Sequence, residues 1–413
     1  MVKWLKWLAA AGVLGVLLLA GVAVALQHWL RTEDFRARVE KEAAAALGVP
    51  LKLGRLSVDL FPVPAVAVDQ VRLQTKPSAL SVERVEARPR WAALLMGRLE
   101  IKTLVVRQAV LPQTGIAALT AVMQKKDKDK GKKPEPAAPG KPLVLPQSVL
   151  LDNITWIDEK GQPITIDAKA DLTDDGLLDS ASFKVVAGRF EGTHGEIKQE
   201  GKEWPVEIAI GGGHVKGKLQ LQPGKAAGLQ LLTGQLTTEN VEVSALTAPS
   251  KPLTGKLQAQ TTLRSEYKDP GQIVDVLQTS THFTVRNAEL QGIDLARAVQ
   301  TVGLSRGGST RLDTLAGQVN TQGKTVHLTN LVATSGSLSA TGNVTLAANK
   351  SLSGRVAVDL AHGALGVPLA VGGTLDEPSV TLTSAALAGS AVGAATTSIG
   401  DKIGNGLRGL FGK

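Results

Sequence analysis

Apolar and polar residues alternate along most of the chain after its first 50 residues. The clearest run has its apolar positions at Ile164, Ile166, Ala168, Ala170 and Leu172, with polar residues between them. A period of two places apolar side chains on one face of a β-strand and polar side chains on the other. Similar runs recur about every 10 residues and glycines separate them, so we expect a long, twisted antiparallel sheet with one apolar face.

This apolar face is expected to curl into an open groove, with short helices at the ends of the sheet. The positions that we expect to line the groove are Val66, Val68, Ile164, Ile166, Leu172, Val326, Leu328, Val344 and Leu346. Aromatic residues make up only 3% of the chain, so the lining is aliphatic. Such a surface binds acyl chains with about 25 cal/mol per Å² buried and without preference for a headgroup. The same pattern also fits a dry core sealed by protein, and both possibilities stay open at this point.

The amino-terminal segment has the pattern of a membrane anchor. Trp7 to Leu26 carries no charge and is long enough to cross the hydrocarbon core of a bilayer. Lys3 and Lys6 precede it, which favours a cytoplasmic amino terminus and an exported body. Trp7, Leu18 and Trp29 are therefore expected to contact the membrane. The alternative is a cleaved signal peptide, because Ala23 and Ala25 form a small-x-small site.

Helical signals occur at three further places. Thr32 can cap a helix that ends at Gly48, with acidic residues in its first turn. Helical spacing returns briefly at 293–302. The last segment, 385–413, is rich in glycine and has an apolar helical face with basic residues beside it. That face consists of Ile399, Ile403, Leu407, Leu410 and Phe411, and the last four are expected to contact a membrane. It either folds on a membrane or a partner, or is a frayed tail.

The segment from Gln124 to Pro146 is dense in lysine and proline and has no apolar period, so we expect a linker or loop. It could contact anionic lipid or nucleic acid, but a solvated loop is the favoured interpretation. The expected divisions are 1–31 (cytoplasmic stub and anchor), 32–123 (helix and β region), 124–146 (linker), 147–384 (β region) and 385–413 (tail).

Composition and motifs give no support for an enzyme. The chain has no cysteine, which excludes disulfides and thiol chemistry, and its formal charge is +9. Ser305 lies in a G-x-S-x-G match, but it lacks the strand before and the helix after that a nucleophile elbow needs. Gly323-Lys324-Thr325 reads as a hairpin turn, not a phosphate loop, and the six histidines have no metal-binding spacing. We expect no catalytic residues, no bound metal, no cofactor and no nucleic-acid partner.

Four stretches resemble motifs of the AsmA family. Leu47 to Leu73 is similar to the start of the family's sequence, where the end of a helix is followed by a strand and an "FP" corner. Arg90 to Val106 is similar to the strand pair that follows. Asn287 to Leu295 and Val367 to Val380 resemble its carboxyl-terminal motifs. The resemblance implies a single-pass protein of the inner membrane of Gram-negative bacteria with a periplasmic body. It further implies a role in outer-membrane biogenesis and a fold like that of chorein-like bridge proteins, which carry lipid in an apolar groove.

Three hypotheses follow. In the first, the protein holds or transfers phospholipid or another acyl lipid, with the inner membrane, and possibly the outer membrane or envelope proteins, as partners. In the second, it is a non-enzymatic assembly factor for outer-membrane proteins and has a dry core; exposed sheet edges would support such pairing. In the third, it is a hydrolase that uses Ser305, which the sequence around this residue disfavours.

Overall fold

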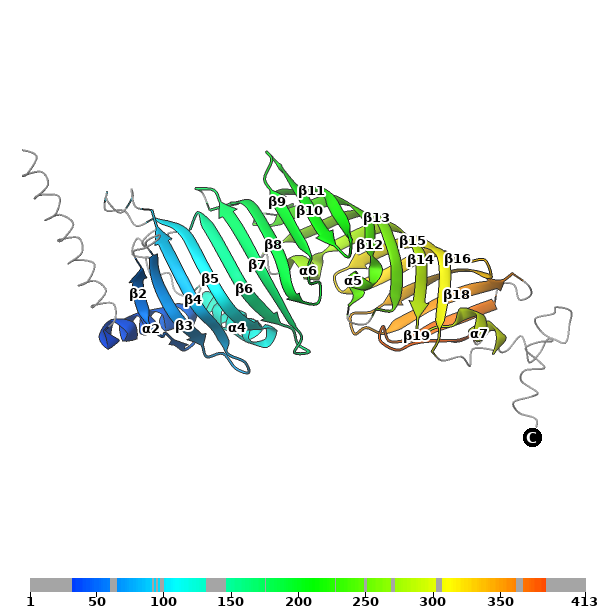
Figure 1. Ribbon diagram of the computed structural model, residues 1–413, viewed down its shortest axis with the longest axis horizontal. Helices are drawn as coiled ribbons and strands as arrows, with labels where there is room; N and C mark the ends of the chain where they lie inside the picture. The colour runs from blue at the N-terminus through cyan, green and yellow to red at the C-terminus, as the bar shows by residue number, and fades with distance from the viewer. Residues whose placement is uncertain are drawn as a thin grey trace, which may run out of the picture. The chain divides into compact units, whose positions relative to one another are not determined.

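The computed structural model describes twelve stretches of the chain: 32–59, 65–90, 93, 96, 100–130, 146–174, 176–226, 228–248, 251–268, 272–301, 307–361 and 367–383. The chain divides into two compact units, Met1–Gly192 and Thr193–Lys413 (Figure 1). The expected anchor, the carboxyl-terminal tail and Ser305 lie outside the described residues. So do the expected membrane contacts Trp7, Leu18, Trp29, Ile403, Leu407, Leu410 and Phe411. Within the described stretches, no helix is both long and apolar enough to span a bilayer.

The first unit opens with helix α2 (Glu33–Leu47), whose ends are those that the sequence predicts. The Thr32 hydroxyl accepts a hydrogen bond from the backbone N–H of Phe35 at 3.4 Å. Gly48 ends the helix with a φ of 76°, and its N–H donates to the Ala44 carbonyl. Both predicted caps are therefore confirmed.

In the described residues of the first unit, the sheet contains eight strands. They are β1 (Leu51–Lys52), β2 (Leu56–Asp59), β3 (Ala65–Leu73), β4 (Leu80–Pro89), β5 (Ile101–Pro112), β6 (Ser148–Ile157), β7 (Pro163–Leu172) and β8 (Leu178–Gly188). β1 and β2 both pair with β3, and each later strand pairs with the next. The predicted strand from Ile164 to Leu172 is confirmed as β7.

The prediction of an antiparallel sheet is confirmed except at one pair. β5 and β6 run parallel, with Leu104 opposite Val149. Two parallel neighbours need a long crossover connection, and here it holds helix α4 (Gln113–Lys130). The prediction of a linker from Gln124 is also wrong for residues 124–130, because lysine and glutamine continue a helix well. The lysine-rich segment thus joins two strands of one unit, and the units divide at Gly192 instead.

The second unit is a meander of twelve antiparallel strands. They are β9 (His194–Lys198), β10 (Glu203–Ile210), β11 (Gly213–Pro223), β12 (Gln230–Glu242), β13 (Leu253–Tyr267), β14 (Gln278–Gln291), β15 (Ser309–Gln322), β16 (Thr325–Thr334), β17 (Leu338–Leu346), β18 (Leu352–Leu360), β19 (Val367–Gly373) and β20 (Pro378–Leu382). The described parts of its connections contain three short helices: α5 (Val243–Thr247), α6 (Ile273–Val276) and α7 (Leu295–Gln300). α7 confirms the helical spacing seen near Ile293, and Gly323-Lys324 forms the predicted hairpin turn.

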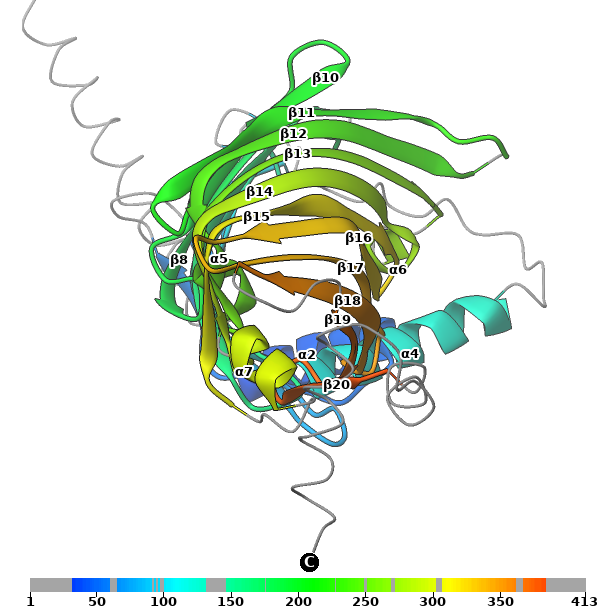
Figure 2. The same cartoon turned by 90° about the vertical axis from the view of Figure 1, so that its right-hand side faces the viewer.

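Left-handed residues bend the strands at recurring positions. Asparagine or glutamine with φ between 50° and 59° occurs at Gln70, Gln108, Asn153, Asn240, Asn287 and Asn330. Within each unit, the three strands that carry these residues run in the same direction, and the strand register shifts beside Asn153, Asn240 and Asn330. Such bulges increase the bend and twist of a strand. Figure 2 shows the strands of the second unit as strongly curved ribbons, with α7 near one end and α6 near the other.

Candidate functional site: an apolar sheet face in each unit

The strand register places most of the apolar strand residues of each unit on one face of its sheet, here called the apolar face. Residues paired across neighbouring strands point to the same side, so paired positions form rows that cross the sheet. In the second unit, α5 and α7 lie in the connections at one end of the strands, here called the helix-covered end. The other end, formed by the connections after β11, β13, β15 and β17, is called the open edge.

The helix-covered end of the second unit is a dry core. One row there runs through Val241, Leu257, Val285, Leu315, Ala333, Ala340, Val358 and Val367. All but Leu257 and Leu315 are buried, and Val241 and Val358 are 0% exposed. Helix α7 closes over this core with Leu295 and Ala298, which belong to the same buried cluster. The Thr310 hydroxyl fixes the start of α7, because it accepts from the Leu295 N–H at 2.9 Å and donates to the Ile293 carbonyl.

Between this core and the open edge, two rows of the same face are only half-buried. One row consists of Val206, Gly217, Leu236, Thr261, Thr281, Val319, Leu328, Val344, Gly354, Val371 and Val380. The next consists of Trp204, Leu219, Gly234, Leu263, Thr279, Thr321, Val326, Leu346 and Leu352. Val380 is buried and every other member of the two rows is partly accessible to solvent. The described part of the chain therefore does not seal these rows, which we call the open rows.

Four threonines interrupt the open rows without making them polar. The hydroxyls of Thr261 and Thr281 hydrogen-bond to each other at 3.0 Å, and those of Thr279 and Thr321 at 2.7 Å. A hydroxyl that is already paired costs less to cover with an apolar ligand than a free one. The methyl groups remain available, so the surface is suited to contact with hydrocarbon.

The first unit repeats this arrangement. Its open rows are Val68, Val85, Val106, Leu151, Ala168 and Phe183, and beside them Val66, Ala87, Leu104, Val149, Ala170 and Ala181. All of these residues are half-buried or exposed. At the other end of the strands Leu80 and Ala109 are buried, and Gly115 of α4 packs against the Leu80 side chain. Each unit thus has a helix-covered end and an accessible apolar surface.

All nine residues expected to line a groove lie on the apolar faces. In the first unit these are Val66, Val68, Ile164, Ile166 and Leu172; in the second they are Val326, Leu328, Val344 and Leu346. Val326 pairs with Leu346 and Leu328 with Val344, so the last four form one contiguous patch. Val66 is 42% exposed and the others are half-buried. Ile164 and Ile166 lie nearer the helix-covered side, where the paired residues Ile154 and Val185 are buried.

The opposite face carries ion pairs. On β10 and β11, Lys218 Nζ lies 2.7 Å from Glu203 and Lys216 Nζ lies 2.8 Å from Glu207. Hydrogen bonds from these lysines lower the pKa of both glutamates, and the same bonds raise the pKa of both lysines. All four side chains are well exposed, and exposed pairs stabilise little. Their contribution is to keep this face wet and charged.

A more buried cluster occupies the same face of the first unit. Glu86 contacts Arg84 at 2.8 Å and Arg88 at 3.0 Å, and Arg107 lies 3.5 Å away. Burial raises the pKa of Glu86, but the arginine hydrogen bonds and charges outweigh it and hold the pKa below its ordinary value. The small Ala67 and Val105 beside Glu86 are buried. Charged side chains therefore occupy this face of the first unit as well.

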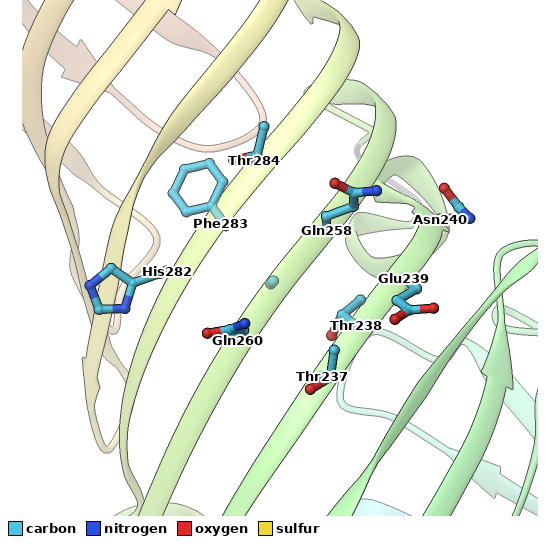
Figure 3. A pocket seen from close by; sticks show the side chains of 10 residues that line it. Thr237, Thr238, Glu239, Asn240, Gln258, Gln260, His282, Phe283 and Thr284 are labelled. Carbon is cyan, nitrogen blue, oxygen red and sulfur yellow. The ribbon is translucent and has the colours of Figure 1, made fainter.

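A polar pocket of about 420 Å³ lies on β12, β13 and β14 (Figure 3). Its lining residues are Thr237, Thr238, Glu239, Asn240, Gln258, Ala259, Gln260, His282, Phe283 and Thr284. His282 is 2.6 Å from Gln318, and Glu239 is 3.1 Å from His214. The sequence does not single out this pocket, because its threonines and glutamines resemble any solvated strand face. Within the described part of the chain, no group of three or more His, Cys, Asp or Glu residues could hold a metal ion.

The left-handed residues are the feature that periodicity misses. The N–H of Asn153 donates to the Asp167 carboxylate at 2.8 Å, and the N–H of Asn330 donates to the Asn343 amide oxygen at 2.9 Å. Asn153 and Asn343, which head glycosylation-type triplets in the sequence, therefore have a structural role at bulges. One pair of residues indicates such a bulge. Leu328 and Leu331 both lie on the apolar face, whereas regular alternation would place residues three apart on opposite faces.

Comparison with models of protein families gives a match to the first part of the chain. The model of the AsmA family matches residues 1–198, which confirms the resemblance seen at Leu47 to Val106. No curated protein and no solved structure matches the chain.

Proposed function

Because the first 198 residues of the chain belong to the AsmA family, we propose that the protein binds phospholipid or another acyl lipid along the apolar faces of its sheets. In this proposal it is anchored in the inner membrane by 7–26, has a periplasmic body and acts in outer-membrane biogenesis and envelope lipid homeostasis. The chemistry is binding and transfer, with no catalytic residue and no cofactor.

The observation that carries the proposal is the contrast between the two ends of each apolar face. Val358 at the helix-covered end is completely buried, whereas Val344, on the neighbouring strand but in an open row, is partly accessible. A sheet whose whole apolar face formed a dry core would bury both ends alike. A surface that is aliphatic, contiguous and left accessible is instead suited to a ligand that is itself hydrocarbon.

The lining also fits weak and unselective contact. The open rows consist of valine, leucine, alanine, glycine and self-paired threonine, with Trp204 and Phe183 as the aromatic members. Each methylene buried on such a surface contributes about 0.8 kcal/mol. Nothing in these rows recognises a headgroup, so lipids with different headgroups would bind with similar affinity. Such binding is suitable for transfer, in which the lipid must also leave.

The test is to purify the full-length protein and quantify bound lipid by extraction and mass spectrometry. The proposal expects phospholipid to copurify with the protein. A charged residue at position 328 should abolish this copurification. A charged residue in place of His327, the neighbouring residue on the polar face, should leave it unchanged. A folded protein without any bound acyl lipid would contradict it. That outcome would favour the second candidate, an assembly factor for outer-membrane proteins, for which the dry helix-covered core is the supporting observation.

A further inference from the structure

The open edge of the second unit carries a short helix with exposed apolar side chains. β13 ends at Tyr267, opposite the start of β12, and β14 begins at Gln278, opposite the end of β15. The connection between them, which contains α6, therefore lies at the open edge, where the open rows end. Val274 of α6 is 64% exposed and Val276 is 41% exposed. Both valines therefore face solvent at the open edge.

Helix α6 is held firmly in this position. The hydroxyl of Ser265, a residue only 1% exposed, donates a hydrogen bond to the Ile273 carbonyl at 3.1 Å. On the other side, Gly323 of the next hairpin packs so closely that an added Cβ would lie 2.6 Å from the Asp275 carbonyl oxygen. Contacts on both sides therefore hold α6 in place, and the two valines are exposed in this position.

Lysines flank this helix along the same edge. The four successive connections at the open edge each carry one exposed lysine: Lys225, Lys268, Lys324 and Lys350. Strands lie about 4.8 Å apart, so alternate connections place these lysines roughly 10 Å from each other. Lys324 is 3.4 Å from Asp275, and the other three have no ion-pair partner among the residues that the structure describes. The next connection at this edge, between β19 and β20, carries Asp376 and Glu377 instead of a lysine.

We propose that this edge, defined by Val274, Val276 and the four lysines, rests on the surface of an anionic phospholipid bilayer. The valines enter the headgroup–acyl boundary and the lysines contact lipid phosphates. The inference rests on the proposed function, because the contact would place the open rows beside the lipids that they bind. Two exposed valines are far too small for a stable protein interface, which buries about 800 Å² per partner. Shallow insertion into a bilayer needs only a few aliphatic side chains and neighbouring basic residues.

The absence of cysteine permits a direct test in the full-length chain. A single cysteine at Val274→Cys carries an environment-sensitive NBD label, and Val332→Cys carries it as the matched control. Val332 is 46% exposed but points to the opposite face of the sheet, between Leu331 and Ala333. Each protein is placed in phosphatidylcholine nanodiscs and mixed with vesicles of 30% phosphatidylglycerol and 70% phosphatidylcholine that contain a nitroxide-labelled lipid.

The proposal expects a blue shift and quenching of the label at position 274 and no change at position 332. Lys268→Gln and Lys324→Gln should each weaken the response about fivefold, whereas Lys216→Gln on the opposite face should not. Equal responses at positions 274 and 332, or none at 274, would overturn the proposal. Leu328→Asp separates the two proposals, because it should remove bound lipid and leave the response at 274 intact. If the protein retains bound lipid but the label at position 274 gives no response, only the proposal of a membrane-contacting edge is contradicted.

Discussion

A charge in the open rows should remove bound lipid without unfolding the protein, and Leu328→Asp is the sharpest case. Leu328 pairs with Val344 and Val319 in an open row and is half-buried. In the empty protein a carboxylate at this position still reaches water, so the free energy of unfolding should fall by less than about 1 kcal/mol.

With lipid bound, the same carboxylate would face hydrocarbon. A charged side chain in contact with acyl chains costs about 2–3 kcal/mol, which corresponds to a lipid affinity about 30- to 150-fold weaker. His327→Asp is the matched control, because His327 is the preceding residue of the same strand and is exposed on the opposite face. It should retain the parent affinity within about twofold.

The assay is titration with a phospholipid that carries a fluorescent acyl chain, together with the thermal midpoint of each variant. An affinity for lipid that does not change in a folded Leu328→Asp protein would refute the reasoning. So would a large loss of stability, because it would mean that the row is a dry core in which a charge is buried.

Three further predictions concern the fold. Val358→Ala, at a fully buried position of the helix-covered end, should lower the free energy of unfolding by about 2–3 kcal/mol in denaturant titrations; a loss under 0.5 kcal/mol would argue against a tight core there. Asn330 has a φ of 51°, so Asn330→Val should cost about 1–2 kcal/mol more than Asn330→Gly in the same assay, and equal values would exclude backbone strain as the cause. Glu86 has a lowered pKa, so its ionised form stabilises the fold above the ordinary glutamate pKa of about 4.3, and this stabilisation is lost as the pH falls through the lower folded-state pKa. Glu86→Gln should therefore be less stable than the parent at pH 7, and the difference should shrink below pH 4; a difference that does not change with pH would contradict the ion-pair account.

The sequence predicts the strands and the side that each presents because alternation is a local property. Ile164 to Leu172 needs only its own pattern to be assigned to a strand with one apolar face. The same holds for the caps of α2, since Thr32 and Gly48 act on the backbone next to them. For the same reason the nine groove candidates lie on the apolar faces, whereas their contact with lipid stays a prediction.

The parallel pair of β5 and β6 could not be predicted in the same way. Strand direction depends on the length and path of the connection, and the lysine-rich segment from Gln124 to Pro146 has no apolar pattern that shows its path across the sheet. Long-range packing also decides how far each residue is covered. Val358 and Val344 look alike in the sequence. Packing between residues far apart in the chain, those of α7 among them, makes the first a core residue, whereas the second stays accessible.

The most direct test of the central claim is photocrosslinking in cells from single positions of the full-length protein. A photoreactive amino acid is introduced at Leu346 in an open row and, as controls, at Val358 in the helix-covered core and at His327 on the opposite face. The account predicts phospholipid adducts from position 346 and none from positions 358 and 327. Adducts from 346 that contain only this chain or other proteins, and never lipid, would contradict it.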